Sequence, residues 1–240
     1  MYGKKIVMAS GYLEQSHRCY RIKEKMNNKN IVIIDYGMGN TGSIDNALQY
    51  LGSSCVVSNK KEDIVDSKAI ILPGVGSFST AMNHLIELDL ISTLTTTVSN
   101  DRIPFLGICL GMQLLAQDSV EGGYTRGLGW IEGHVRKIKS NKDLKLPHVG
   151  WNNIKISKGS KLFENIDNDA NFYFDHSYEL ICDEKLDATR VEYGKDIIST
   201  IQKQNIWATQ FHPEKSQRNG LKILRNFLNY VDSTNNCNIS

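Results

Sequence analysis

Residues 104–117 read PFLGICLGMQLLAQ, an apolar run in which a cysteine has a glycine two positions away on each side. The run up to Ile108 predicts a buried β-strand, and residues 110–117 predict a helix that follows it directly. A strand that turns at once into a helix leaves little room for side chains at the bend. Small flanking residues therefore let the central residue stand at the tip, as in the elbow of serine hydrolases. Here that residue is Cys109.

Cys109 in this position has the features of an activated nucleophile. The unpaired N–H groups and the dipole of the following helix stabilise a thiolate, and the N–H of Leu110 lies where an oxyanion needs a donor. A lone cysteine is more often a small buried hydrophobe. The two glycines and the strand–helix context favour the nucleophile instead.

A cysteine nucleophile needs a base, and the base needs a group that orients it. Of the six histidines, His212 stands out because it follows the β-like run 206–211 and precedes Glu214 by two residues. Side chains two residues apart in an extended chain point to the same side, so Glu214 would lie beside the His212 ring. There it would fix the imidazole tautomer and stabilise the imidazolium. A histidine at a strand end is more often structural, but the pairing of HPE with GICLG favours catalysis.

The segment PGVG at residues 73–76 is a second source of oxyanion donors. It follows the apolar run 69–72, and ligands of open α/β sheets bind at the carboxyl ends of the strands. Its glycines let a peptide turn its N–H toward an oxyanion, if necessary by a flip. Alone the motif is weak, because P-G-x-G is usually just a turn.

The first half of the chain alternates between apolar runs and helical stretches, which predicts an α/β fold with a mostly parallel central sheet flanked by helices, as in flavodoxin-like proteins. The second half holds short β-like runs that predict additional antiparallel strands, and the amphipathic stretch 220–231 predicts a closing helix. We expect strands at 31–35, 55–58, 69–72, 104–108, 130–139, 153–156, 171–178, 188–193, 197–202 and 206–211, and helices at 43–51, 78–90, 91–99 and 110–117.

We expect one domain over residues 31–231, with an N-terminal extension before it and a polar tail after it. Residues 1–30 are basic, polar after Ala9 and without a sustained period, so they predict an N-terminal extension. A start at Met26, just before the first apolar run, would make residues 1–25 the product of an upstream start. Residues 232–240 form a polar tail.

Composition excludes several classes of protein. A net charge of +2 is too small to indicate binding to nucleic acid or to an acidic membrane, and no apolar run approaches the roughly 20 residues that span a bilayer. The five cysteines are scattered, odd in number and without CxxC spacing. A disulfide framework or a zinc site is therefore not expected, and a reducing cytoplasm fits better. No pattern indicates a metal or an organic cofactor.

Together these segments resemble the class I (triad) glutamine amidotransferases, and among them the HisH-type glutaminase subunits of imidazole glycerol phosphate synthase. The resemblance covers about residues 31–231. The GICLG and HPE segments are common to the class, whereas the PHxGWN-like and YFxHSY-like segments are specific to the subfamily. The matching segments are IIDYGMGN (33–40), LPGVGSF (72–78), GICLGMQL (107–114), GLG (127–129), PHVGWN (147–152), YFDHSY (173–178) and QFHPEKS (210–216).

The resemblance implies a catalytic role for each of several residues. Cys109 would attack the carboxamide of glutamine. His212 would act as the base and then as the acid for departing ammonia, and Glu214 would orient it. Leu110 together with Val75–Gly76 would supply the N–H groups of an oxyanion hole.

The resemblance also implies a set of substrate-binding residues. Gln113 and Glu121 match positions that hold the substrate glutamine, and Glu121 carries the charge expected to meet its α-ammonium group. Ser177 and Tyr178 fall where the backbone supports the substrate. For Gln113 and Glu121 the plain alternative is a solvated helix face.

A partner follows from the chemistry. Ammonia released into neutral water becomes mostly ammonium, which is not a nucleophile, so such a glutaminase is useful only when docked on a synthase with a protected passage. For this subfamily the partner would be a HisF-like (β/α)₈ cyclase that makes imidazole glycerol phosphate and AICAR in histidine biosynthesis. Asn40, Trp151 and Lys215 match positions near that interface.

Two departures from the subfamily pattern lie toward the expected partner face: Asp175 replaces an apolar residue, and Thr41-Gly42 stands where Leu or Ile is usual. They leave open a paralogue that supplies ammonia to a sugar-amidating enzyme of surface polysaccharide biosynthesis. A non-catalytic binding subunit is a third hypothesis, which the intact Cys109, His212 and Glu214 disfavour. A free-standing cysteine hydrolase, such as a γ-glutamyl peptidase, is the fourth, and it is disfavoured because there is no lid domain.

Overall fold

The computed structural model describes residues 30–139, 144–156 and 159–237, with side chains up to Thr234. Residues 1–29 of the extension expected over residues 1–30, and the last three residues of the expected tail, lie outside the described residues. The first half of the chain forms β1 (Ile31–Ile34), α2 (Thr41–Tyr50), β2 (Cys55–Ser58), α3 (Lys61–Val65), β3 (Ala69–Leu72), α4 (Phe78–Glu87), α5 (Ile91–Thr95), the π-helical turn η1 (Thr96–Asn100), β4 (Phe105–Ile108) and α6 (Leu110–Gln113).

The second half is mostly β-structure and ends in one long helix. Its elements are β5 (Asp118–Ser119), β6 (Thr125–Arg126), β7 (Gly133–Lys137), β8 (His148–Lys155), the 3₁₀ turn η2 (Lys161–Phe163), β9 (Asn171–His176), β10 (Tyr178–Cys182), β11 (Asp187–Glu192), β12 (Asp196–Lys203), β13 (Ile206–Thr209), the 3₁₀ turn η3 (Pro213–Lys215) and α7 (Gln217–Cys237).

The central sheet has nine strands in the order β2-β1-β3-β4-β13-β12-β11-β8-β9. The first five pair in parallel and the rest pair antiparallel. This confirms the α/β fold, and the parallel part has the strand order of a flavodoxin-like sheet. Every residue of β1, β3 and β4 is buried, as expected of parallel strands that are covered on both faces.

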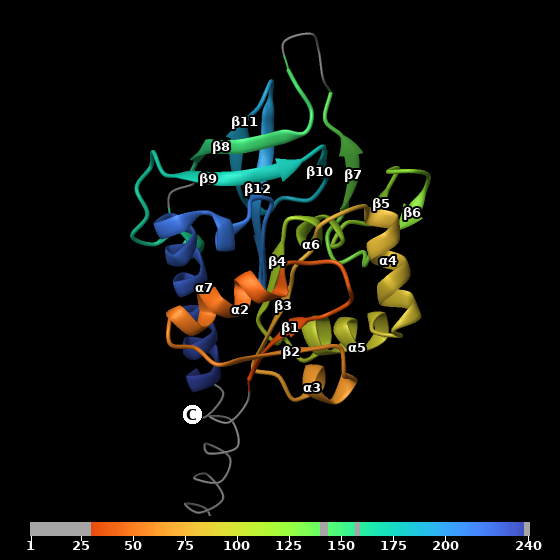
Figure 1. Ribbon diagram of the computed structural model, residues 1–240, viewed down its shortest axis with the longest axis vertical. Coiled ribbons are helices and arrows are strands. Elements are labelled where there is room, and N and C mark those ends of the chain that lie inside the picture. Colours follow the sequence, from red (N-terminus) through yellow and green to blue (C-terminus); the bar gives the residue numbers. More distant parts are fainter. Residues whose placement is uncertain (1–29, 140–143, 157–158, 238–240) are drawn as a thin grey trace, which may run out of the picture.

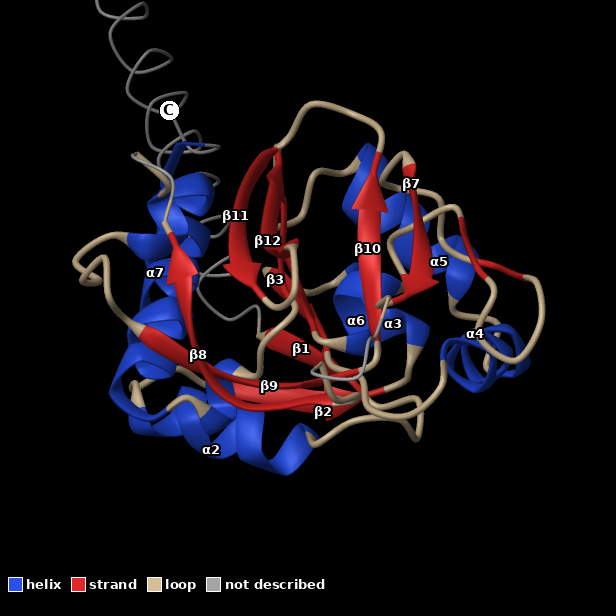
Figure 2. Ribbon diagram, turned by 90° about the horizontal axis from the view of Figure 1, so that it is seen from above, coloured by secondary structure: helices blue, strands red, loops and turns tan. Residues whose placement is uncertain are grey.

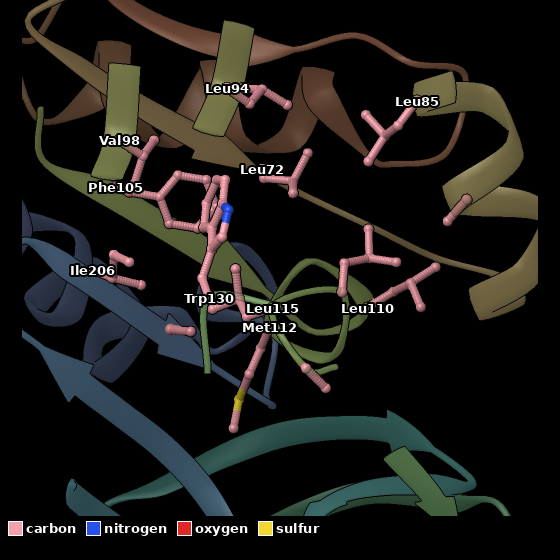
Figure 3. Packing of buried hydrophobic residues seen from close by; sticks show 14 of the residues in the cluster. Leu72, Leu85, Leu94, Val98, Phe105, Leu110, Met112, Leu115, Trp130 and Ile206 are labelled. Atoms are coloured by element: carbon pink, nitrogen blue, oxygen red, sulfur yellow. The ribbon is translucent and has the colours of Figure 1, made fainter. Parts of the chain in front are cut away.

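Helices cover the two faces of the parallel strands (Figure 1). On one face Ile31 and Ile33 belong to the same buried cluster as residues of α2 and α7. Their neighbours Val32 and Ile34 point to the opposite face and the cluster under α3, α4 and α5. Figure 3 shows part of the second cluster, where the ring of Trp130 meets Phe105 edge-on at a centroid distance of 5.1 Å.

A second sheet of four strands, β10-β7-β5-β6, stands beside the central one (Figure 2). The single strand expected over residues 171–178 is wrong, because the chain changes sheets at Ser177. Strand β9 pairs with β8 up to His176, whereas β10 begins at Tyr178 and pairs with β7. At the junction, the carbonyl of Ser177 accepts a hydrogen bond from the N–H of Ile138.

Several helices differ from the sequence prediction. The predicted helix 91–99 is α-helical only to Thr95 and continues as the π-helical turn η1, and the predicted helix 78–90 ends at Glu87. The predicted helix 110–117 ends at Gln113, because the carbonyls of residues 114–116 accept hydrogen bonds from N–H groups of the segment 128–131. Helix α3 was not predicted; it is five residues long and has no side-chain cap. Helix α7 continues to Cys237, past the expected end at Val231, so part of the expected polar tail is helical.

Candidate active site

The turn from β4 into α6 is the predicted elbow. Cys109 has φ 54° and ψ −109°. Residues other than glycine rarely adopt this backbone conformation, and those that do cluster at functional sites. A Cβ on Gly111 would lie 1.9 Å from the carbonyl oxygen of Leu72, and one on Gly107 would lie 2.8 Å from that of Gly111. Both glycines are therefore required by close backbone contacts.

His212 and Glu214 form a buried pair at the end of β13. The Nδ1 of His212 lies 2.8 Å from the Oε1 of Glu214, and their side chains are 3% and 1% exposed. The His212 N–H donates to the carbonyl of Tyr173, whose own N–H donates to the Oγ of Ser216. The Ser216 hydroxyl in turn donates to the His212 carbonyl, so η3 is tied to β9.

The charge state of His212 follows from its surroundings. Burial acts against the charged ring, but the hydrogen bonds and negative charges of Cys109 and Glu214 outweigh it and raise the pKa of His212 to about 10. The second oxygen of Glu214 is buried and has no hydrogen-bond partner within the described part of the chain. Within the described residues, the Glu214 carboxylate therefore makes its hydrogen bond through Oε1, the oxygen that faces the His212 ring.

A cavity of about 300 Å³ opens onto the elbow. Its size is at the lower end for small-molecule sites. It brings together all the predicted catalytic, oxyanion and substrate residues except Glu214. The cavity is lined by Val75, Gly76, Cys109, Leu110, Gln113, Glu121, Pro147, Asp175, His176, Ser177, Tyr178 and His212.

Gln113 is 4% exposed, so the alternative of a solvated helix face is wrong for this residue. Its Nε2 donates to the Tyr178 carbonyl and to the Oε1 of Gln210, each at 3.0 Å. Glu121 is half-buried, and its Oε2 accepts the N–H of Phe78 at the first turn of α4. Each side chain is thereby held in place at the cavity wall.

Backbone groups at the cavity are already engaged. The Tyr178 carbonyl accepts from Gln113 and lies 2.8 Å from the Nδ1 of His176. The N–H of Leu110, a predicted oxyanion donor, donates to the Gly74 carbonyl over a long distance of 3.4 Å. The oxyanion hole is therefore not open in this structure.

The three predicted interface residues do not line the cavity. Asn40 caps α2 by accepting the N–H of Ser43. Trp151 is 45% exposed and meets the ring of Tyr173 at a centroid distance of 6.1 Å. The Nζ of Lys215 lies 5.5 Å from the same ring, so Trp151 and Lys215 flank Tyr173 on β9.

The departures from the subfamily pattern lie in two places. Asp175 is exposed on β9 and lines the cavity, and its carbonyl lies 3.9 Å from the Cys109 sulfur. Thr41 and Gly42 form the start of α2, where Gly42 is exposed.

Sequence reasoning missed several residues around the site. Gln210 lies beside the Cys109 sulfur, and the Tyr36 hydroxyl donates to the Pro73 carbonyl next to the oxyanion segment. The Nε2 of His176 lies 3.0 Å from the Nδ1 of His148. Burial lowers the pKa of both histidines to about 4, so the pair is neutral at pH 7. A polar residue at the end of the apolar run 206–211 was the signal for Gln210.

Comparisons with known proteins agree on one family. Residues 32–231 match the family model of class I glutamine amidotransferases. The chain is 48% identical over 202 residues to imidazole glycerol phosphate synthase subunit HisH 2 of Vibrio vulnificus, covering 84% of this chain and 94% of that protein. It is also 48% identical over 198 residues to subunit HisH of Methanocaldococcus jannaschii, covering 82% and 98%.

A solved structure supports the fold. The crystal structure of a putative GMP synthase subunit from Thermoplasma acidophilum has a TM-score of 0.68 with this chain at 20% identity. The match covers 88% of this chain and 98% of that one.

Within the described ranges, no group of three or more His, Cys, Asp or Glu side chains is arranged to hold a metal ion. Likewise, none of the described helices is long and apolar enough to cross a membrane.

The elbow generates a prediction about stability. Gly111→Ala would drive a methyl group into the Leu72 carbonyl, and we expect a loss of several kcal/mol of unfolding free energy in chemical denaturation. Gly42→Ala is the matched control, because a Cβ there meets nothing within 4 Å and alanine stabilises a helix by roughly 0.5–1 kcal/mol over glycine. Equal stabilities of the two variants would contradict the close contact.

The raised pKa of His212 predicts a pH dependence. An imidazole with a higher pKa in the folded state contributes stability that is full below its ordinary value of 6.5 and is lost as pH rises through about 10. Glu214→Gln removes one cause of the shift. We expect its His212 to titrate at lower pH in ¹⁵N NMR, and its unfolding free energy to decline less between these pH values. An unchanged titration would show that Glu214 does not set the charge of the ring.

Proposed function

The chain belongs to the class I glutamine amidotransferase family, and we propose that it is the glutaminase subunit of an imidazole glycerol phosphate synthase in histidine biosynthesis. The observation that supports this most directly is the cavity where Cys109, on its elbow, meets His212, which is held by Glu214. Within this proposal, L-glutamine is the substrate, and the products are glutamate and ammonia.

Cys109 supplies the nucleophile of the reaction. Its sulfur attacks the carboxamide carbon of glutamine, and the tetrahedral intermediate collapses to a γ-glutamyl thioester as the C–N bond breaks. His212 first takes the proton of the Cys109 thiol and holds it at neutral pH, because its pKa is about 10. The ring gives that proton to the departing ammonia. It then takes a proton from the water that hydrolyses the thioester, and glutamate leaves.

The cavity wall provides groups suited to the rest of the substrate. Glu121 offers a carboxylate to the α-ammonium group, and one of its oxygens is held by the N–H of Phe78. Gln113 uses both hydrogens of its Nε2 within the protein, which leaves its Oε1 as the atom that would accept from the substrate. Ser177 and Tyr178 complete the wall opposite the elbow.

The oxyanion hole needs a rearrangement before it can act. The N–H of Leu110 would have to leave the Gly74 carbonyl, to which it makes a long hydrogen bond, and point at the developing oxyanion. Gly76, at φ +102°, gives the segment that includes Val75 the backbone freedom to turn. The resting chain is thus poorly prepared for turnover.

A HisF-like (β/α)₈ cyclase is the proposed partner in a heterodimer. Trp151 and Lys215 flank Tyr173 on β9, and Asp175 on the same strand lines the cavity. Asn40 caps α2. A partner on this face would contact the walls of the site and receive ammonia without release to water. The cytoplasm suits this assembly, since it keeps the Cys109 thiol reduced.

Of the alternatives, the sugar-amidating paralogue is not favoured, since the relatives described above carry the histidine-pathway name. The departures at Asp175 and Thr41-Gly42 do not change this assignment.

The nucleophile is tested by Cys109→Ala. Removing the sulfur leaves only binding and oxyanion stabilisation, so we expect ammonia release from glutamine to fall by on the order of 10³-fold or more. Circular dichroism should show an intact fold. In the wild type, an alkylating agent should modify Cys109, and glutamine should protect it. Near-normal activity of the alanine variant would refute the mechanism.

The engaged Leu110 N–H predicts dependence on the partner. The chain alone should turn over glutamine slowly, and a docked cyclase with its own ligand should raise kcat by at least about 10²-fold, which equals roughly 2.7 kcal/mol of transition-state stabilisation. Steady-state kinetics with and without the cyclase measure this. Full activity of the isolated chain would revive the free-standing hydrolase.

A further inference from the structure

Gln210 lies beside Cys109 at the elbow and has no part in the mechanism above. It follows β13 immediately, is fully buried, and places its Nε2 3.6 Å from the sulfur of Cys109. Burying a polar group costs free energy unless it is hydrogen-bonded, and the Gln210 amide has Gln113 on one side and the Cys109 sulfur on the other.

The neighbouring hydrogen bonds determine which end of the Gln210 amide faces the sulfur. The Tyr178 carbonyl can only accept, so the Gln113 atom that contacts it must be the Nε2. The same Nε2 has a second hydrogen, which it donates to the Oε1 of Gln210. The Gln210 Nε2 is therefore the atom that points at Cys109.

The backbone holds this amide in register with the nucleophile. The Gln210 N–H donates to the Ser199 carbonyl on β12 at 2.8 Å, and the Cys109 N–H donates to the Thr209 carbonyl at 2.7 Å. Both residues thus follow directly from paired strands, and the donor is in place before any substrate arrives.

We propose that Gln210 is a hydrogen-bond donor to the Cys109 sulfur and a further catalytic residue of the glutaminase reaction; this rests on the function proposed above. Two polar groups near the sulfur act in opposite senses. The Asp175 carbonyl, 3.9 Å away, can accept only from a protonated thiol. The Gln210 Nε2–H stabilises the sulfur when it carries negative charge, both before attack and when the thioester is hydrolysed.

The donor also connects the nucleophile to the substrate wall. A continuous chain runs from the Cys109 sulfur through Gln210 and Gln113 to the Tyr178 carbonyl. Gln113 lies at the middle of this chain, so the position of the sulfur and the wall opposite it depend on the same hydrogen bonds.

Two substitutions remove the donor in different ways. Gln210→Glu keeps the shape and the oxygen that accepts from Gln113 but turns a carboxylate oxygen toward the sulfur. Gln210→Met keeps the length of the side chain without any donor or charge. For the full chain with its cyclase, we expect both to lower kcat on the order of 10- to 100-fold, the size of a lost hydrogen bond to a charged group. KM should stay within about threefold in Gln210→Glu, which keeps the bond to Gln113.

The rate of alkylation by iodoacetamide measures the reactivity of the Cys109 sulfur in the absence of glutamine. We expect the rate of modification of Cys109 at pH 7 to fall in both variants, and to fall further in Gln210→Glu, because its carboxylate repels the thiolate. Ser199→Ala is the matched control, since it removes a buried hydroxyl bonded to Thr189 on the adjacent strand and keeps the carbonyl that accepts from Gln210. It should lower the melting temperature but leave kcat and the alkylation rate unchanged.

Each outcome decides for or against the donor role. Wild-type kcat and alkylation in a folded Gln210 variant would overturn the proposal, and so would a raised KM with normal alkylation, which would mark a purely structural support of the cavity wall. If the wild-type complex releases no ammonia from glutamine but the alkylation rates still differ as expected, the proposed function fails and the donor role of Gln210 stands.

Discussion

The backbone of Cys109 is held at φ 54° between Gly107 and Gly111, and the surrounding fold must keep the turn in this conformation. Such a conformation persists only where its surroundings over-determine it. Here β4 is paired on both sides, by β3 and β13, and Gly111 packs against the Leu72 carbonyl. The parallel sheet therefore fixes the end of β4 in a turn that directs the Cys109 sulfur toward the cavity.

The cavity has two halves with different origins. The parallel strands supply Cys109 and the PGVG segment at their carboxyl ends, where ligands of such sheets bind. The antiparallel strands supply the opposite wall, because the chain changes sheets at Ser177, where Ser177 and Tyr178 line the cavity. His212 and Ser216 join the halves through their hydrogen bonds with Tyr173. A protein docked on β9 would thus act on both walls at once.

Local patterns were enough to predict the elbow, the His212–Glu214 pair and the parallel strands, because each depends on neighbouring residues. Contacts between distant segments were not predictable in this way. The chain change at Ser177 depends on pairing with β7, and the early end of α6 depends on carbonyls captured by residues 128–131. Gln210 stands 101 residues from Cys109, and its position beside the sulfur becomes visible only when β13 pairs with β4.

We propose that the strained turn presents Cys109 as the nucleophile that forms an acyl-enzyme with glutamine. Rapid acid quenching of the cyclase complex during turnover, followed by peptide mass spectrometry, tests it most directly. We expect the mass of a γ-glutamyl group on the peptide that carries Cys109, and no such mass when glutamine is omitted. Ammonia release with no acylated cysteine, or with the glutamyl group on another residue, would contradict it.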